Sequence, residues 1–201
     1  MEKKQEFAEN ARRLLKMARL KDKYQKEILP KLKEEFGIRN NMAVPKVTKI
    51  VVNVGTGDAK DNPEIIEKVA ENLSALSGQK PVATKAKLSV SGFKLSKGAK
   101  IGVMVTLRGR RMYEFLDKLI TVVLPKMRDF RGISGESFDS QGNYSLGMRE
   151  QTLFPEVSFK NTNIGGRIRG LEISIISTAK NKERGKRLLE LLGMPFRKGP
   201  S

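Results

Sequence analysis

The chain has 201 residues, no cysteine, no histidine and a formal net charge of +18 at pH 7. The two missing residue types exclude disulfides, thiolate nucleophiles, the usual zinc sites and any imidazole general base. The charge favours a nucleic-acid partner over an anionic membrane, and the lack of cysteine is typical of a cytosolic protein. We expect neither a signal peptide nor a membrane span, because the first residues are charged throughout and no apolar run approaches roughly 20 residues.

The first predicted element is a helix over residues 2–36. Apolar residues recur there at helical spacing, with charged residues between them. Pro30 should kink or divide this helix, and Gly37 is a suitable C-terminal stop. Residues 1–19 form a helical extension whose basic, amphipathic face could lie on RNA, on a membrane or on the domain itself, or could remain a solvated arm.

A strand and a helix are predicted next. The strand covers residues 47–54, and the helix runs from about Asn62 to Leu76. Between them, Gly55-Thr56-Gly57 matches the first part of the G-x-G-x-x-G motif of dinucleotide-binding loops. That motif needs a third glycine at the position where this chain has Lys60. We therefore interpret these glycines as turn residues, or as places where a backbone approaches RNA closely.

The remaining elements continue this alternation of strands and helices. They are a strand over 82–84, a strand over 101–107, a helix over 110–127, a Gly- and Ser-rich hairpin or ordered loop over 131–149, a strand over 171–177 and a helix over 181–192. Few strands that alternate with helices predict an α+β fold, such as a split βαβ sandwich.

The stretch from Asn72 to Tyr113 contains no acidic residue and nine basic ones. It includes a loop over residues 85–100 that combines lysines, hydroxyl side chains and Phe93. Lysines neutralise phosphates, hydroxyls bond to ribose, and an aromatic ring stacks on a base. The sequence therefore favours a loop that contacts RNA; the alternatives are a mobile solvated loop and a core-packed Phe93. The arginines of residues 108–111 suit phosphate binding or plain helix-surface charge.

Two other classes of function fit parts of the sequence. An enzyme acting on nucleotides or RNA is disfavoured, because the chain has no phosphate-binding loop, no histidine and no recognisable acid–base pair of carboxylates. A membrane-surface protein would use the basic extension over residues 1–19 as its anchor. A structural RNA-binding protein accounts for more of the charge pattern than either alternative.

A series of motifs occurs in one order along the chain. The motifs are LSALSGQKP at 73–81, TKAKLSVSGFK at 84–94, VTLRG at 105–109, RDFRG at 128–132, GNYSLG at 142–147, FPE at 154–156, RGLEI at 169–173 and PFRK at 195–198. Together they resemble the bacterial form of the fifth protein of the large ribosomal subunit, over about Leu20 to Lys198. Residues 1–19 exceed the usual start of that family.

The resemblance implies an antiparallel sheet with helices packed on one side and a long cationic loop. It also implies a structural, non-enzymatic protein that anchors 5S rRNA in the central protuberance and touches 23S rRNA. The family's cationic loop approaches the tRNA in the P site. A second loop region reaches a protein in the head of the small subunit and forms an inter-subunit bridge.

Carried onto this chain, the resemblance predicts one RNA-binding domain over 20–198, preceded by the extension over 1–19 and followed by a tail over 199–201. The residues that it implies for rRNA are Lys49, Asn53, Gly55, Gly57, Thr84, Lys85, Lys87, Ser89, Lys97, Lys100, Arg108 and Arg110. For P-site tRNA they are Ser91, Gly92, Phe93 and Lys94, and for the bridge they are Arg131, Gly132, Ser137, Asn143 and Tyr144. No catalytic residue, metal, cofactor, membrane or small-molecule substrate is expected.

Overall fold

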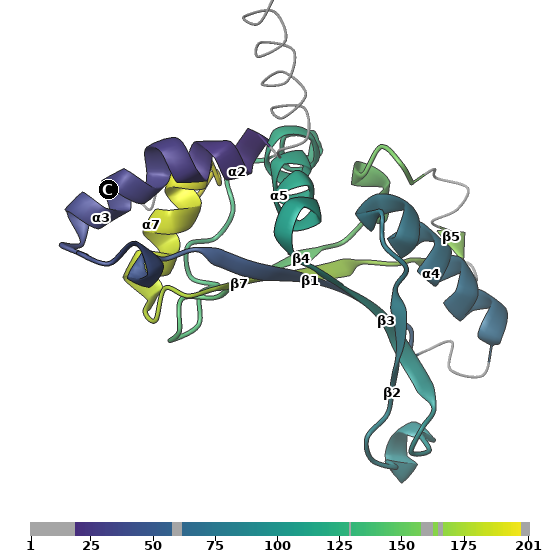
Figure 1. The fold of residues 1–201 in the computed structure, drawn as a ribbon. Helices are drawn as coiled ribbons and strands as arrows, with labels where there is room; N and C mark the ends of the chain where they lie inside the picture. The colour runs from purple at the N-terminus through teal and green to yellow at the C-terminus, as the bar shows by residue number, and fades with distance from the viewer. Residues whose placement is uncertain (1–18, 58–61, 129, 158–162, 165–166, 198–201) are drawn as a thin grey trace, which may run out of the picture. The chain divides into compact units, whose positions relative to one another are not determined.

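The computed structural model describes residues 19–57, 62–128, 130–157, 163–164 and 167–197 (Figure 1). The first part of the helix predicted over residues 2–36, up to residue 18, and the tail over 199–201 lie outside this part. The chain forms two compact units, each assembled from segments far apart in sequence. The helical unit comprises Met1–Thr48, Arg108–Asn143 and Ser177–Ser201, and the sheet unit comprises Lys49–Leu107 and Tyr144–Ile176. The single domain over 20–198 stays a prediction.

The helical unit begins with one helical run that changes pitch in the middle. It consists of α2 (Arg19–Lys23), a π-helical turn η1 (Tyr24–Ile28) and α3 (Leu29–Glu35). At the end of the π-turn, the Leu29 N–H donates to the Tyr24 carbonyl, five residues back. Pro30 follows at once; it has no N–H to donate and its ring would clash with a regular preceding turn. Gly37, at φ +60°, lies just beyond the end of the helix, as predicted.

The same arrangement recurs in the second long helix. α5 (Gly109–Lys118) continues into a π-turn η5 (Leu119–Val123) and a 3-10 turn η6 (Leu124–Lys126). The Leu124 N–H donates to the Leu119 carbonyl, immediately before Pro125. The helix predicted over 110–127 is therefore confirmed, and each proline is accommodated by a widened turn on its N-terminal side.

The last helix of the helical unit has a cap at each end. α7 (Lys182–Leu192) starts at Asn181, whose side chain accepts a hydrogen bond from the Arg184 N–H at 2.9 Å. It ends at Gly193 in the left-handed region. The buried residues Leu188, Leu189 and Leu192 form its core side, and the helix predicted over 181–192 is confirmed.

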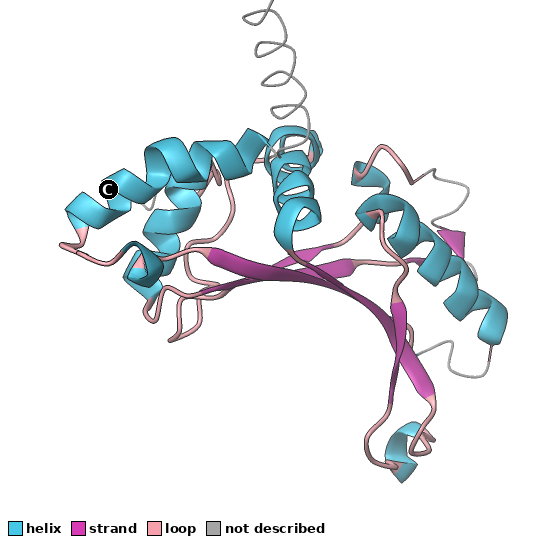
Figure 2. Ribbon diagram, viewed as in Figure 1, coloured by secondary structure: helices cyan, strands magenta, loops and turns pink. Residues whose placement is uncertain are grey.

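The sheet unit contains a five-stranded antiparallel sheet, drawn in magenta in Figure 2. The strand order is β2-β3-β1-β7-β4. The strands are β1 (Val47–Gly55), β2 (Val82–Lys85), β3 (Lys100–Leu107), β4 (Tyr144–Met148) and β7 (Leu171–Ser177). A separate two-stranded pair consists of β5 (Asn163–Ile164) and β6 (Arg167–Ile168). Of the five strands, β4 lies within the segment predicted only as a hairpin or ordered loop.

One face of this sheet is covered by α4 (Pro63–Ser77), which packs against β2 and β3. Its buried residues are Ile66, Val69, Asn72, Leu73, Leu76 and Ser77. On β1 the residues Ile50, Val52 and Val54 are buried, whereas the residues between them are partly exposed. This alternation buries one face and leaves the other open to solvent. The predicted α+β fold, with an antiparallel sheet and helical cover on one side, is confirmed.

Candidate nucleic-acid interface

The predicted cationic loop is an ordered extension of the β2–β3 hairpin. Where the strands end, the Ala86 N–H donates to the Ala99 carbonyl at 2.9 Å, and Gly98 donates back to Ala86 at 2.9 Å. Farther out, Val90 and Leu95 exchange backbone hydrogen bonds of 2.9 and 3.1 Å. These pairs continue the ladder into the loop, so its backbone is fixed by the protein itself before any partner binds.

The tip of the loop is a single 3-10 turn over Ser91–Phe93. Lys94 closes the turn in the left-handed region, at φ 48°, and its N–H donates to the Ser91 carbonyl. The Phe93 side chain is 79% exposed and Leu88 is 74% exposed. The alternative in which Phe93 packs into the core is therefore wrong.

This hairpin carries five lysines and has no acidic neighbour in sequence. Lys85, Lys87, Lys94, Lys97 and Lys100 are all exposed. The stretch from Asn72 to Tyr113 contains no carboxylate, so its own sequence supplies only positive charge, which suits contact with phosphates. Ser89 has an internal role, because its Oγ accepts a hydrogen bond from the Lys97 N–H at 2.9 Å.

The open face of the sheet carries a polar patch next to this hairpin. Thr84 and Gly102 are paired residues on β2 and β3, and Gly102 pairs with Gly55 on β1. A Cβ at Gly102 would lie 2.8 Å from Thr84 Oγ1 and 3.7 Å from Asn53 Oδ1. The missing side chain thus lets a hydroxyl and an amide from different strands come together, as an RNA-reading surface requires.

Sequence reasoning missed Gln79, just after α4. Its side-chain amide donates to the Thr106 carbonyl on β3 at 3.0 Å. The contact links the loop after α4 to β3. Gln79 belongs to the motif LSALSGQKP, but this contact could not be read from the sequence, since the partner is a backbone group 27 residues away.

The structure brings most of the predicted rRNA residues together in the sheet unit. They are Lys49, Asn53, Gly55, Gly57, Thr84, Lys85, Lys87, Ser89, Lys97 and Lys100. The two arginines belong to the helical unit instead. Arg108 is exposed, and the Arg110 guanidinium forms an ion pair with Glu114 at 2.5 Å. That pair leaves Arg110 partly neutralised on the helix surface.

Within the predicted bridge region, residues 131–149, the loop before β4 is organised around Asp139. Its carboxylate accepts hydrogen bonds from the Asn143 side chain at 2.7 Å and from the backbone N–H groups of Gln141 and Asn143. These bonds, with the Asn143 side chain first, hold the pKa of Asp139 below its usual value. The turn is therefore supported by an ionised Asp139 at neutral pH.

The five predicted bridge residues differ in how accessible they are. Arg131 and Ser137 are exposed. Gly132, at φ +97°, lies against the Arg197 backbone, and Asn143 Oδ1 accepts a hydrogen bond from the Ser177 N–H at 3.0 Å. Tyr144 is only 1% exposed. Its side chain packs inside, and the assignment of Tyr144 as a bridge contact stays a prediction.

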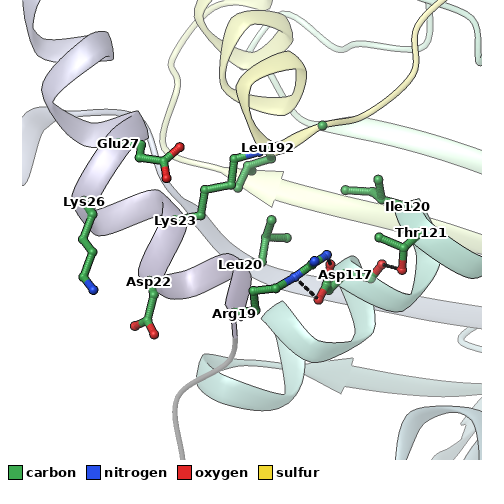
Figure 3. Close-up of a pocket in the computed structure, with 11 residues that line it drawn as sticks. Arg19, Leu20, Asp22, Lys23, Lys26, Glu27, Asp117, Ile120, Thr121 and Leu192 are labelled. Atoms are coloured by element: carbon green, nitrogen blue, oxygen red, sulfur yellow. Dashed lines mark hydrogen bonds and ion pairs between the residues drawn. The ribbon is translucent and has the colours of Figure 1, made fainter. Parts of the chain in front are cut away.

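A hollow in the helical unit marks where the predicted extension joins α2 (Figure 3). Arg19, the last residue of that extension, donates two hydrogen bonds to Asp117 on α5, at 2.8 and 3.3 Å. Next to it, Leu20 is 4% exposed. The ion pair raises the pKa of the Arg19 guanidinium. These contacts fix the start of α2 on α5.

Two negative findings apply to the described residues. They contain no group of three or more acidic side chains arranged to hold a metal ion. None of their helices has the length and apolar character that a membrane crossing requires.

The chain matches two family models that together span most of its length. The model described as "Ribosomal protein L5" matches residues 40–95, and the model for the C-terminus of the same ribosomal protein family matches residues 100–196. The large ribosomal subunit protein uL5 of Thermoanaerobacter sp. (strain X514) is 54% identical over 182 residues, which are 90% of this chain and 100% of that protein. The chain belongs to the ribosomal L5 family.

Other members of the L5 family show the same degree of similarity. The uL5 protein of Carboxydothermus hydrogenoformans is 52% identical over 90% of this chain and 99% of its own length. That of Microcystis aeruginosa is 56% identical over 89% of this chain and 98% of its own length. The chain is accordingly a structural constituent of the large ribosomal subunit, where it binds rRNA, and it is not an enzyme.

Proposed function

We propose that this L5-family chain binds 5S rRNA through the cationic hairpin and the open face of the sheet, and helps to attach it to 23S rRNA in the central protuberance. The observation that carries the proposal is the exposed hairpin loop, which has lysines but no carboxylate. In this proposal the RNA-binding domain covers residues 20–198.

Affinity and specificity come from different parts of this surface. Each lysine that neutralises a phosphate releases condensed counterions, which favours binding but does not select a sequence. Selection requires hydroxyl and amide groups in fixed positions, and Asn53 and Thr84 lie close together over Gly102. Because the loop backbone is already hydrogen-bonded, little conformational entropy is lost on binding.

The tip of the loop, Ser91 to Lys94, contacts P-site tRNA in this proposal. A large aromatic side chain such as Phe93, 79% exposed, is unfavourable in water and favourable when stacked on a base or ribose. Lys94 adds a positive charge beside it. The tip therefore offers one stacking surface and one phosphate contact on a fixed turn.

The loop region over residues 131–149 forms the inter-subunit bridge with a protein in the head of the small subunit. Its accessible candidates are Arg131 and Ser137. Asp139, Asn143 and Gly132 give the loop its shape through their internal contacts.

The 5S assignment is tested by competition between RNAs. Purified protein is mixed with labelled 5S rRNA and an excess of messenger RNA of equal length, and the dissociation constants are measured at several salt concentrations. We expect preferential binding of 5S rRNA, with log K falling linearly with log salt. Equal affinity for messenger RNA, or affinity independent of salt, would contradict the proposal.

A further inference from the structure

A hollow of about 480 Å³ lies in the sheet unit where β1 ends, β7 begins and β4 ends. The three strands are neighbours in the sheet (Figure 1). This volume is within the roughly 300–1,000 Å³ of sites that hold small molecules. The hollow is lined by Asn53, Gly55, Gly147, Met148, Arg149, Gly170, Leu171 and Glu172.

Two of the glycines in this hollow are not required by the protein itself. A Cβ at Gly55 or at Gly147 would meet no atom within 4 Å, and neither glycine has a positive φ. Glycine within a strand lowers stability, since it gains no packing and loses more entropy on folding. A strand glycine with open space above it therefore indicates that another molecule approaches the backbone there. By contrast, a Cβ at Gly170 would lie 2.6 Å from the Met148 carbonyl, so the fold does require that glycine.

Glu172 is the one carboxylate on the open face among the described residues of the five strands. It is exposed and lies directly opposite Gly147 in the β4–β7 register. A carboxylate repels phosphate and only accepts hydrogen bonds. On RNA the donors are base N–H groups and the 2′-hydroxyl. Glu172 is therefore suited to accept hydrogen bonds from the donor edge of a base, and it is unsuited to contact the phosphate backbone of the RNA.

We propose that this hollow holds an unpaired guanine of rRNA, with Glu172 as the residue that recognises it. The Watson–Crick edge of guanine has two adjacent donors, N1–H and N2–H, which match the two carboxylate oxygens. Gly55 and Gly147 leave room for the ring, and the exposed Arg149 at the rim neutralises a flanking phosphate. The inference rests on the proposed rRNA-binding function and adds a sequence-reading position to it.

The first test fills the hollow without disturbing the fold. Gly147→Ala has space for its methyl group, so its midpoint of urea unfolding should equal or exceed that of the wild type. Its affinity for rRNA should fall about tenfold, because the methyl group occupies the place of the base. Gly135→Ala in the helical unit is the matched control, since its Cβ would meet only the end of Lys186 at 3.8 Å. Unchanged rRNA affinity of Gly147→Ala overturns the proposal.

The second test uses the sign of a charge effect. Electrostatics alone predicts that Glu172→Gln, which removes a negative charge, binds rRNA as well as or better than the wild type. If Glu172 accepts two bonds from guanine, the same change should weaken binding about tenfold. Kethoxal, which reacts at N1 and N2 of unpaired guanines, then reads the site directly. The wild type should protect one guanine that Glu172→Gln leaves reactive, while other protections remain.

Purified 5S rRNA and 23S rRNA are probed separately, so that the two proposals fail in different ways. If Glu172 is needed to protect a guanine in 23S rRNA and the protein does not bind 5S rRNA, the guanine site in the hollow is supported and the 5S assignment is rejected. Normal 5S binding with no Glu172-dependent guanine, or with a cytosine protected instead, leaves the proposed function intact and overturns this inference. Binding of neither RNA overturns both.

Discussion

Replacing Lys85 and Lys87 together by alanine should weaken binding to 5S rRNA by roughly 30-fold, or about 2 kcal/mol, near physiological salt. Both side chains are exposed on either side of the buried Ala86, in a segment without acidic residues. Two lost phosphate contacts should also reduce the log–log salt slope by about 1.5. Filter binding across a salt series measures both quantities.

The control for this double variant is the removal of two lysines from a different surface. Lys23 and Lys26 are exposed on the first helical run, and their replacement by alanine is compatible with a helix. We expect this control to keep the wild-type salt slope. Equal losses in the two double variants would show that total charge, and not the hairpin, governs binding.

Gly185→Ala should destabilise the protein by about 3 kcal/mol. A Cβ at position 185 would collide with the carbonyl oxygen of Gly142 and lie 2.8 Å from its Cα. Backbone atoms cannot move aside as a flexible side chain can. The sign of the change in unfolding free energy is informative, because helix propensity alone favours alanine over glycine in α7 by about 1 kcal/mol. Urea unfolding measures the change.

The Gly185 variant also tests how the bridge loop is positioned. Gly142 belongs to the turn that Asp139 organises, so a collision with α7 displaces that turn. Lys186→Ala, an exposed neighbour on the same helix, should change stability by less than about 0.5 kcal/mol. A Gly185→Ala protein as stable as the wild type would mean that α7 and the turn are not packed as described.

The helices and most strands of the main sheet could be predicted from local signals. α4 is bounded by Pro63 and Gly78, and β1 and β7 are rich in β-branched residues. β4 was not identified as a strand, since its sequence YSLGM contains serine and glycine and its pairing with β7 is far apart in the chain. The π-turns before Pro30 and Pro125 depend on how the backbone adjusts, which a hydrophobic pattern does not encode.

The location of the cationic hairpin could be predicted from the sequence, but the orientation of the individual side chains on the functional surface could not. The charge pattern located the hairpin, and the resemblance identified the family. The strand register, however, decides which side chains face outward. It places Glu172 opposite Gly147 on the open face and Tyr144 inside, and neither position could be read from the residues alone.

The most direct test of the account is cleavage of RNA by a chelated iron attached at the loop tip. The chain has no cysteine, so Ser91→Cys gives a single attachment point on an exposed residue, and unlabelled wild type serves as the control. In ribosomes reconstituted with 5S rRNA and P-site tRNA, hydroxyl radicals from this position should cut the tRNA and adjacent rRNA. If no RNA strand is cut from the tip, the exposed cationic hairpin does not meet RNA in the ribosome.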